Sequence, residues 1–362
     1  MSERARVPES ARSTPPKGRT ATSASDPENE STGRREFLVK ASAMGAAALL
    51  ALPRTALAEP PPEVTRIRMI HAPSICLAPQ LLAEELMRLE GFSEVEYVEI
   101  KSNLLSREIV EGRADISMMA APEIIVAIDA SERVVVLGGI HAGCYELFGN
   151  NQTQRIRDLK GKRVVISGVG SPEHTYVSSI LAYVGIDPTK DVTWVQAPTS
   201  ADALRVFMEG GAEGFLAFPP QPQELRAKRI GHAIVDTTRD RPWSQYFCCV
   251  VAANREFVAR YPVASKRALR AIVKAADICA EDPERAAAYL VSRKYEPRYE
   301  IALEVLKGLP YRRWRDADPE DTLRFHALRL HEVGMIKSTP QKLIAQGTDW
   351  RFFNELKREL KA

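Results

Sequence analysis

The sequence lacks a hydrophobic run long enough to cross a membrane. A membrane-spanning helix needs about 20 consecutive apolar residues, whereas the longest candidate, residues 41–52, contains Ser42 and stops at Pro53. The sequence also contains no Gly-rich phosphate loop and no G-x-S-x-G nucleophile motif. These absences argue against an integral membrane protein and against the common nucleotide-dependent and hydrolytic enzymes.

Most of the chain also has no excess of charge of either sign. The formal net charge is +3, but nine of the 50 Lys and Arg residues and six of the 47 Asp and Glu residues fall within the first 58 positions. The remaining chain is therefore electrically neutral. A neutral surface gives no support to nucleic acid or an anionic membrane as a partner.

Cysteine is scarce, and its spacing fits no common framework. The five cysteines include no C-x-x-C pair, and an odd number leaves at least one thiol free. Cys248 and Cys249 are adjacent in a strand-like run, so we expect their side chains to point to opposite faces. His326 and His331 are five residues apart, which misses the spacing of three or four that places two ligands on one helix face.

The first 58 residues are predicted to be a disordered extension followed by a twin-arginine export signal. Residues 1–33 carry almost no large apolar side chains and cannot bury enough surface to offset chain entropy. Arg34 and Arg35 then precede Phe37 and Leu38, a weakly hydrophobic stretch and a small-x-small cleavage pattern at residues 56–58. An amphipathic helix at a domain edge is disfavoured, because prolines separate this stretch from the rest of the chain. We therefore expect a periplasmic protein beginning near Glu59.

From Val64 onward, β-branched runs alternate with amphipathic stretches, which predicts an α/β fold with mostly parallel sheets. Strands are expected at residues 64–70, 95–100, 115–118, 134–140, 163–166, 192–196, 214–217 and 233–235. Helices are expected at residues 77–89 and 172–183, and in a tail at residues 254–260, 262–280, 283–293, 297–306, 319–333 and 349–360. Several of these helices begin at proline, whose missing amide hydrogen costs nothing at that position.

Three segments carry a specific resemblance. They are HAPSICLAP at residues 71–79, GRADI running into MAAPE at residues 112–123, and DLKGKRV at residues 158–164 followed by GVGSPEH at residues 168–174. Together they resemble the periplasmic substrate-binding proteins of ABC importers, in the nitrate, sulfonate, taurine and thiamine-pyrimidine group. The resemblance implies a two-lobe periplasmic binding protein fold of type II with a helical C-terminal segment. Lobe one would comprise residues 64–140 and 250–362, lobe two residues 141–249, with the ligand in the cleft between them.

The resemblance and the chemistry of α/β sheets place the ligand at the same loops. Ligands of open α/β sheets gather at the carboxyl ends of strands, beside helix N-termini. The candidate ligand-binding residues on these loops are His71, Ser74, Cys76, Ala121, Pro122, His141, Cys144, Tyr145, Glu146, Gly170, Ser171, His174, Phe218 and Gln221.

Each candidate also has a structural alternative. Ser171 is expected to cap the helix that opens at Pro172, with or without a bound anion, and His174 or His71 either donates to ligand or packs within the protein. Residues 139–146 are expected to form the first crossover, where glycines allow lobe closure. His141, Cys144, Tyr145 and Glu146 would then be hinge residues as well as ligand contacts.

The leading hypothesis is a monomeric, non-catalytic protein without a cofactor, which binds a small solute and delivers it to a membrane permease. The pocket loops contain histidines and glutamates but no obvious arginine, which favours an organic solute with donor and acceptor groups over a simple inorganic anion. Two alternatives remain open. One is an enzyme resembling the eukaryotic pyrimidine-synthesising group of this fold, although Cys248-Cys249 matches its multi-cysteine iron motif poorly. The other is a metal-binding or sensory protein in which His71, Cys76, His141, Cys144 and His174 converge.

Overall fold

A computed structural model describes residues 59–131 and 133–361 of the chain; the expected export signal lies outside these residues. The strands are β1 (Arg66–His71), β2 (Glu94–Glu99), β3 (Ile116–Ala120), β4 (Val134–Ala142), β5 (Glu146–Gly149), β6 (Arg163–Ile166), β7 (Thr193–Gln196), β8 (Gly214–Ala217), β9 (His232–Asp236) and β10 (Phe247–Asn254). The helices are α2 (Ala78–Leu89), α3 (Ser106–Val110), α4 (Ala121–Ala130), α5 (Pro172–Tyr183), α6 (Ser200–Met208), α7 (Gln221–Lys228), α8 (Arg255–Arg260), α9 (Pro262–Glu281), α10 (Pro283–Ser292), α11 (Tyr299–Gly308), α12 (Pro319–Glu332), α13 (Pro340–Gly347) and α14 (Arg351–Glu359). Short 3-10 helices are η1 (Ile75–Leu77), η2 (Ile156–Leu159), η3 (Trp243–Gln245) and η4 (Tyr311–Arg315). None of the described helices is long and apolar enough to cross a membrane.

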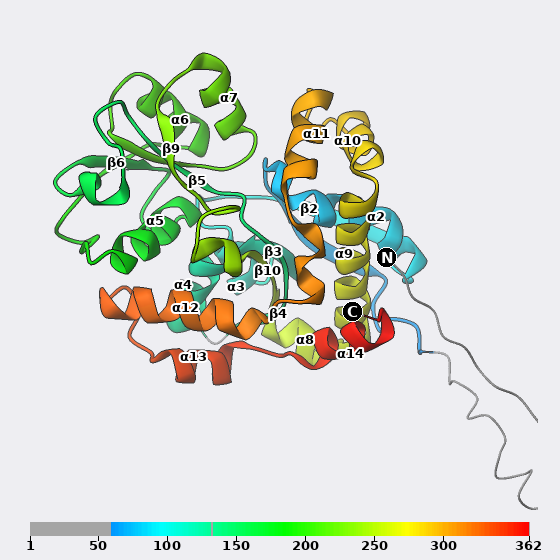
Figure 1. The fold of residues 1–362 in the computed structure, drawn as a ribbon. Helices are drawn as coiled ribbons and strands as arrows, with labels where there is room; N and C mark the ends of the chain where they lie inside the picture. Colours follow the sequence, from blue (N-terminus) through cyan, green and yellow to red (C-terminus); the bar gives the residue numbers. More distant parts are fainter. Residues whose placement is uncertain (1–58, 132, 362) are drawn as a thin grey trace, which may run out of the picture. The chain divides into compact units, whose positions relative to one another are not determined.

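The described strands form three sheets (Figure 1). β1 pairs with β2, the order β3-β10-β4 makes a second sheet, and β7-β6-β8-β5-β9 makes a third. All eight predicted strands are present, but the expectation of mostly parallel sheets is wrong. The pairs β1–β2, β6–β7 and β6–β8 are parallel, whereas β10 runs antiparallel to β3 and β4, and β5 antiparallel to β8 and β9. The chain passes from the second sheet to the third between β4 and β5, and it returns to the second sheet between β9 and β10.

The second sheet is the centre of the core. Every residue of β3 and β4 is buried, and so are all residues of β10 except Asn254. Strands buried on both faces become continuous apolar runs rather than alternating ones, which matches the sequences VVVLGGI and FCCVVAA. The sheet contacts α4 on one side, while α9, α14 and η4 contact β4.

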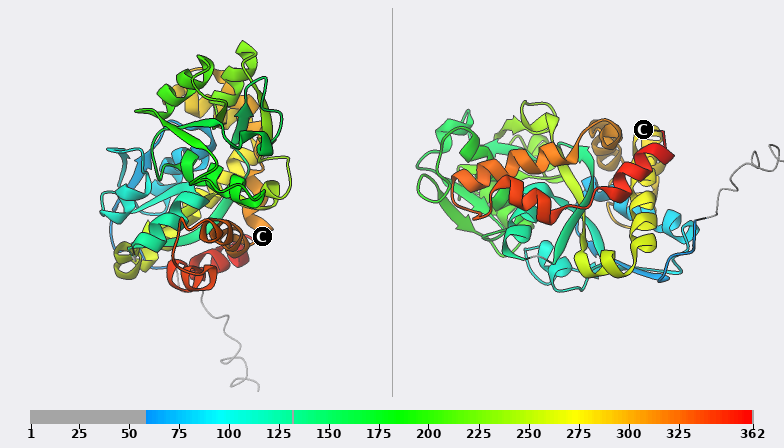
Figure 2. Two further views of the ribbon diagram at one scale, coloured as in Figure 1. Left: turned by 90° about the vertical axis from the view of Figure 1, so that its left-hand side faces the viewer. Right: turned by 90° about the horizontal axis from the view of Figure 1, so that it is seen from below.

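The C-terminal helices contact elements that pack on the second sheet and elements that pack on the third. α12 packs against α4 and also against α5, the helix that follows β6 of the third sheet (Figures 1 and 2). The contact includes a buried hydrogen bond of 2.8 Å between the Ser179 hydroxyl and Nδ1 of His326. Phe325 stacks on Tyr246 with ring centroids 4.2 Å apart. The C-terminal helices therefore hold the second and third sheets together.

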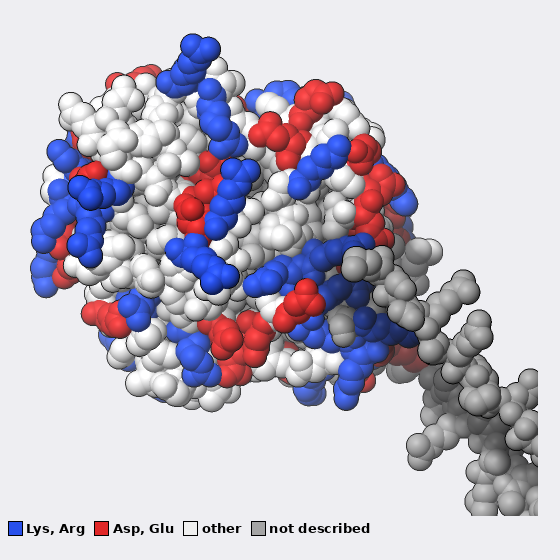
Figure 3. Space-filling model, viewed as in Figure 1, with Lys and Arg blue, Asp and Glu red and all other residues white. Residues whose placement is uncertain are grey.

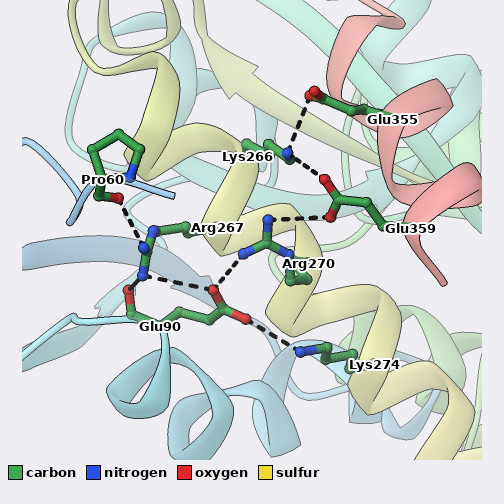
Figure 4. Close-up of polar contacts among 8 residues, drawn as sticks. All are labelled: Pro60, Glu90, Lys266, Arg267, Arg270, Lys274, Glu355 and Glu359. Atoms are coloured by element: carbon green, nitrogen blue, oxygen red, sulfur yellow. Dashed lines mark hydrogen bonds and ion pairs between the residues drawn. The ribbon is translucent and has the colours of Figure 1, made fainter. Parts of the chain in front are cut away.

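Ion pairs join α9 to α2 and to α14. Glu90 at the end of α2 is 8% exposed, and its carboxylate lies 2.7 Å from Arg270 and 3.4 Å from Lys274. Arg270 and Lys266 also pair with Glu359 on α14 (Figure 4). Elsewhere, the face in Figure 3 carries Lys and Arg interspersed with Asp and Glu. One helix thus links α2 to the C-terminus.

The expected crossover glycines have two different roles. Gly138 and Gly139 lie inside β4, where an added Cβ atom would overlap the rings of Phe353 and Phe247. They make room for packing, and the crossover begins only after β4 ends at Ala142. Gly143 does adopt φ of +70°, and it is followed by Cys144 at +114°. The backbone turn therefore occurs between β4 and β5.

Packing against Phe247 makes Gly139→Ala destabilising. The added methyl would overlap the ring, and overpacking a filled core costs about 1–3 kcal/mol of unfolding free energy. Gly308→Ala is the matched control, because its Cβ would meet nothing within 4 Å and alanine is favoured in a helix. Urea unfolding should show a lower midpoint for the first variant and an equal or higher one for the second. Equal stability of Gly139→Ala and the wild type would contradict this packing role.

Candidate functional site

A cavity of about 510 Å³ opens where loops of the three sheets meet. It lies at the carboxyl ends of β1, β2, β3, β6 and β8, as expected for a ligand site of an α/β protein. Its lining combines apolar walls with a small number of polar groups, which is typical of small-molecule sites. The lining residues are His71, Ala72, Pro73, Ser74, Cys76, Leu77, Glu99, Ile100, Lys101, Ser102, Asn103, Leu105, Met118, Met119, Ala120, Tyr145, Ser167, Pro172, Glu173, Thr199, Ser200, Ala201, Phe218 and Cys249.

Hydrogen bonds join the opposite walls of the cavity. The backbone amide of Ile75 in η1 donates to the carbonyl of Pro219, which follows β8, at 3.3 Å. On another side, the Asn103 amide donates to the carbonyls of Ser167 and Pro198. Residues of the first expected lobe, before residue 141, therefore contact residues of the second expected lobe across the cavity. These contacts join the cavity walls on more than one side.

The polar groups of the cavity are mainly hydroxyls and one buried carboxylate. Glu173, in the first turn of α5, is 2% exposed and accepts hydrogen bonds from Ser167 at 2.9 Å and Ser200 at 2.5 Å. A carboxylate in that position satisfies the positive end of the helix. Lys101 adds a cationic side chain to the lining, which the sequence reasoning did not anticipate.

His71 lines the cavity as predicted, but one of its nitrogens is already used. Its Nδ1 atom lies 2.8 Å from the carboxylate of Glu99, its neighbour across β1 and β2. Its ring also contacts Tyr295, with centroids 5.8 Å apart. Nε2 is therefore the nitrogen that remains for a ligand.

Gly170, Ser171 and His174 form a self-contained turn outside the cavity lining. The Ser171 hydroxyl caps α5 by accepting from the His174 amide at 3.2 Å. His174 Nδ1 in turn accepts from the Gly170 amide at 3.0 Å, and its ring packs edge-on against Trp194. Burial lowers the pKa of His174 to about 4. The neutral imidazole therefore serves as an internal acceptor that shapes the turn.

The remaining predicted residues divide between the cavity and its surroundings. Tyr145 and Phe218 line it, with ring centroids 6.3 Å apart. Gln221 lies behind this wall, where its side chain accepts from the Phe218 amide and donates to the Ser200 carbonyl. Ala121 and Pro122 are buried in the first turn of α4, and Glu146 pairs with Arg226 at 2.6 Å. These four residues are outside the lining.

A cluster of thiols and one imidazole lies beneath the cavity. Cys76 of η1, His141 of β4, Cys144 of the following turn and Cys249 of β10 are all buried, and their potential ligand atoms lie within 4.8 Å of one another. This is the one group among the described residues with the composition of a metal site. Of the five residues in the metal-binding hypothesis, the structure brings Cys76, His141 and Cys144 together, whereas His71 and His174 lie elsewhere.

A β-bulge adds the fourth member of this cluster. In the pairing of β10 with β4, Phe247 lies opposite Ala142 and Cys249 opposite His141, so Cys248 is an extra residue. The Sγ atoms of Cys248 and Cys249 consequently lie only 3.8 Å apart. The expectation that they point to opposite faces is wrong, because strict alternation fails at a bulge. Cys248 also approaches Cys144, with 2.7 Å between the sulfur atoms.

The thiols of the cluster perturb one another. Hydrogen bonds from neighbouring thiols, first of all Cys144, hold the pKa of Cys249 well below its usual range. Burial raises the pKa of Cys144. For His141, burial is the largest single influence and favours the neutral ring, but the charge of Cys249 and hydrogen bonds with Cys249, Ala142 and Cys76 together raise the pKa. Cys249 is therefore the one thiol of this group whose pKa is lowered, since those of Cys76, Cys144 and Cys248 are raised.

Sequence reasoning missed the lining from residues 99–105 and 199–201. These residues end or follow β2, or lie at the start of α6, and the strand-end rule that identified His71 would have found those after β2. Cys249 was missed for a different reason, because only the bulge directs its thiol toward Cys76.

The buried imidazole of His174 makes stability depend on pH. An unfolded histidine has a pKa of about 6.5, whereas His174 has a pKa of about 4 in the fold. Between these values the unfolded chain binds a proton that the folded chain does not, so stability falls as the pH drops. From pH 7 to pH 5 the contribution of His174 to this loss is about 2 kcal/mol.

His174→Gln keeps an acceptor for the Gly170 amide but cannot be protonated. Urea unfolding at both pH values should show a smaller loss of stability for this variant than for the wild type. Identical pH dependence in the two proteins would contradict a buried, neutral His174.

Comparisons with solved structures agree with this architecture. The periplasmic nitrate-binding protein NrtA from Synechocystis PCC 6803 superposes with a TM-score of 0.69 at 17% identity, covering 83% of this chain and 90% of that chain. The alkanesulfonate-binding protein SsuA from Xanthomonas axonopodis pv. citri, bound to MOPS, gives 0.64 at 14% identity, covering 81% and 99%. The periplasmic aliphatic sulphonate binding protein SsuA from Escherichia coli gives 0.55 at 20% identity, covering 69% and 84%.

These similarities confirm the predicted fold class: the chain has the periplasmic binding protein fold with a helical C-terminal segment. No curated protein matches the chain. Residues 61–292, well over half of the sequence, match one family description. The chain belongs to the NMT1-like family.

Proposed function

We propose that this chain is the periplasmic solute-binding component of an ABC importer, and that it holds one small organic solute in the cavity. The observation that carries the proposal is the cavity itself, a space of about 510 Å³ lined by loops of all three sheets. Such a space suits a ligand of modest size that is largely buried when bound. The fold shared with nitrate- and sulfonate-binding proteins supports the same role.

The lining favours an organic solute over a bare inorganic anion. Leu105, Met118, Met119 and Phe218 provide apolar contact area that a small inorganic anion would leave unused. Glu173 would also repel a second anion at the start of α5. An acceptor carboxylate and the cation of Lys101 on one lining match a solute with donors and acceptors, such as a taurine-like zwitterion, an organic sulfonate or a pyrimidine-like ring.

Binding would work by closure rather than by chemistry. We propose that residues 64–140 and 250–362 form one lobe and residues 141–249 the other, with the two connections near residues 143 and 246 as hinges. A solute that contacts both lobes binds the closed form more tightly and shifts the population toward it. The closed protein, exported by the twin-arginine route and acting as a monomer, would then present the solute to a membrane permease.

A thermal-shift screen of the purified chain tests this proposal. The panel contains taurine, alkanesulfonates, pyrimidines, aromatic carboxylates and nitrate. A solute at about 100 times its dissociation constant adds about 2.7 kcal/mol of stability, which corresponds to a rise of several degrees in Tm. We expect one organic class to produce this shift and nitrate to produce none. A shift with nitrate alone would contradict the assignment of an organic solute.

Tyr145→Phe tests whether the solute occupies this cavity. Removing one neutral hydrogen bond to a ligand costs about 1 kcal/mol, so we expect the dissociation constant measured by calorimetry to rise about fivefold. Tyr176→Phe is the control, because the Tyr176 ring packs on Tyr145 with centroids 4.9 Å apart but does not line the cavity. Equal affinity of both variants and the wild type would place the solute elsewhere.

A further inference from the structure

The cluster of Cys76, His141, Cys144 and Cys249 combines four ligands of two types, thiol and imidazole, which favour the same metals. Thiolates and imidazole select soft, closed-shell cations such as Zn²⁺ and Cu⁺, and a complete set of four protein ligands is typical of a structural zinc site. We propose that these four residues bind one such cation, Zn²⁺ or Cu⁺, directly beneath the solute cavity.

The spacing of the donor atoms fits this proposal. In a tetrahedral site with metal–sulfur bonds of about 2.3 Å, neighbouring donors are about 3.8 Å apart. The four potential ligand atoms already lie within 4.8 Å of one another. Small side-chain adjustments therefore suffice to enclose a metal, and the ligands come from three separate segments that the fold has already brought together.

His141 supplies an independent observation. The residue is fully buried, and its Nε2 atom has no hydrogen-bond partner, which costs stability unless something else satisfies it. Its Nδ1 atom lies 3.3 Å from the Ala142 carbonyl. A histidine that ligates a metal commonly donates its other nitrogen to a backbone carbonyl in this way. The arrangement leaves Nε2 as the ligand atom.

Three further features position the residues that carry the thiols. Cys144 adopts φ of +114°, a region that side-chain-bearing residues rarely enter and that occurs where surrounding structure or function demands it. The Ser74 hydroxyl lies 3.1 Å from Sγ of Cys76, where it can donate to a thiolate as an outer-shell partner. A second hydroxyl, that of Tyr311, donates to the Cys76 carbonyl at 3.4 Å.

The site would form part of the cavity wall. Cys76 and Cys249 line both the cluster and the cavity, and Ser74 and Leu77 beside Cys76 line the cavity as well. A bound cation would fix the η1 segment against β4 and β10. Because protein ligands fill all four coordination positions, the cation would shape the cavity without an open position for chemistry. This inference does not depend on the identity of the solute or on solute binding.

A disulfide between Cys144 and Cys248 is the competing structure, since their sulfur atoms are the closest pair. It would consume one of the four ligands. Alkylation of the denatured, unreduced chain distinguishes the two, because the metal site leaves all five cysteines open to the reagent once the metal is chelated. Protection of two cysteines, identified as Cys144 and Cys248 by peptide mapping, would overturn the proposal.

The direct test is metal analysis of the full chain, purified without a histidine tag. We expect about one equivalent of zinc or copper per chain, and the element found shows which of the two cations the site binds. If the isolated chain is empty, the reduced protein is titrated with Zn²⁺ and with Cu⁺ separately. Failure to bind about one equivalent of either cation would overturn the proposal.

Variants locate the site. Cys249→Ser and His141→Ala should abolish stoichiometric binding, whereas Cys279→Ser should retain it, because Cys279 is buried in α9 and is not a member of the cluster. Ser74→Ala should weaken the affinity about 10-fold, measured by competition with a chelator. Undiminished binding in Cys249→Ser and His141→Ala would show that the metal lies elsewhere and would overturn the proposal.

Cobalt substitution gives a readout that does not rely on variants that fold. Co²⁺ bound to the wild-type chain should show the intense visible bands of a tetrahedral ion and a thiolate charge-transfer band in the near ultraviolet. The weak visible spectrum of six-coordinate Co²⁺, without the thiolate band, would contradict the ligand set.

Discussion

The pairing of β10 with β4 is the constraint on which the rest of the structure depends. The chain leaves the second sheet through the end of β4 and returns to it through the start of β10, so both crossings lie side by side at the pair Ala142 and Phe247. Packing of the Phe247 ring against Gly139 holds the two strands at this point. The same pair carries Tyr145 to one wall of the cavity and Cys249 to its floor. The cavity and the thiol cluster are therefore both positioned by this strand pair.

The helical tail adds a second constraint, because it contacts both sides of that crossing. α12 packs on α4 and on α5, and the hydrogen bond between His326 and Ser179 is fully buried. A rigid-body separation of the third sheet would break this bond and expose its partners. The proposed closure, with rotation near residues 143 and 246, would therefore also require sliding at α12.

Much of the fold could be predicted from the sequence, because hydrophobic periodicity and the Pro and Gly residues that begin and end elements are local signals. α5 and β6 begin and end as expected, since Pro172 and the β-branched run at residues 163–166 define their bounds. The antiparallel strand β5 was missed because its four residues lie between two turns, and the direction of a strand depends on its pairing partner. The site was found in part for the same reason: strand ends identify loops, but only the bulge at Cys248 determines which thiols meet.

The three histidines near the cavity differ in how the fold uses their ring nitrogens. Nδ1 of His71 is paired with Glu99, and that of His174 with the Gly170 amide, so the fold itself accounts for the position of each ring. His141 is buried as completely as any residue in the core, yet its Nε2 atom faces no partner. An apolar side chain could fill that space at no such cost. In the proposed site a thiophilic cation held by the surrounding thiols would accept the lone pair of this nitrogen.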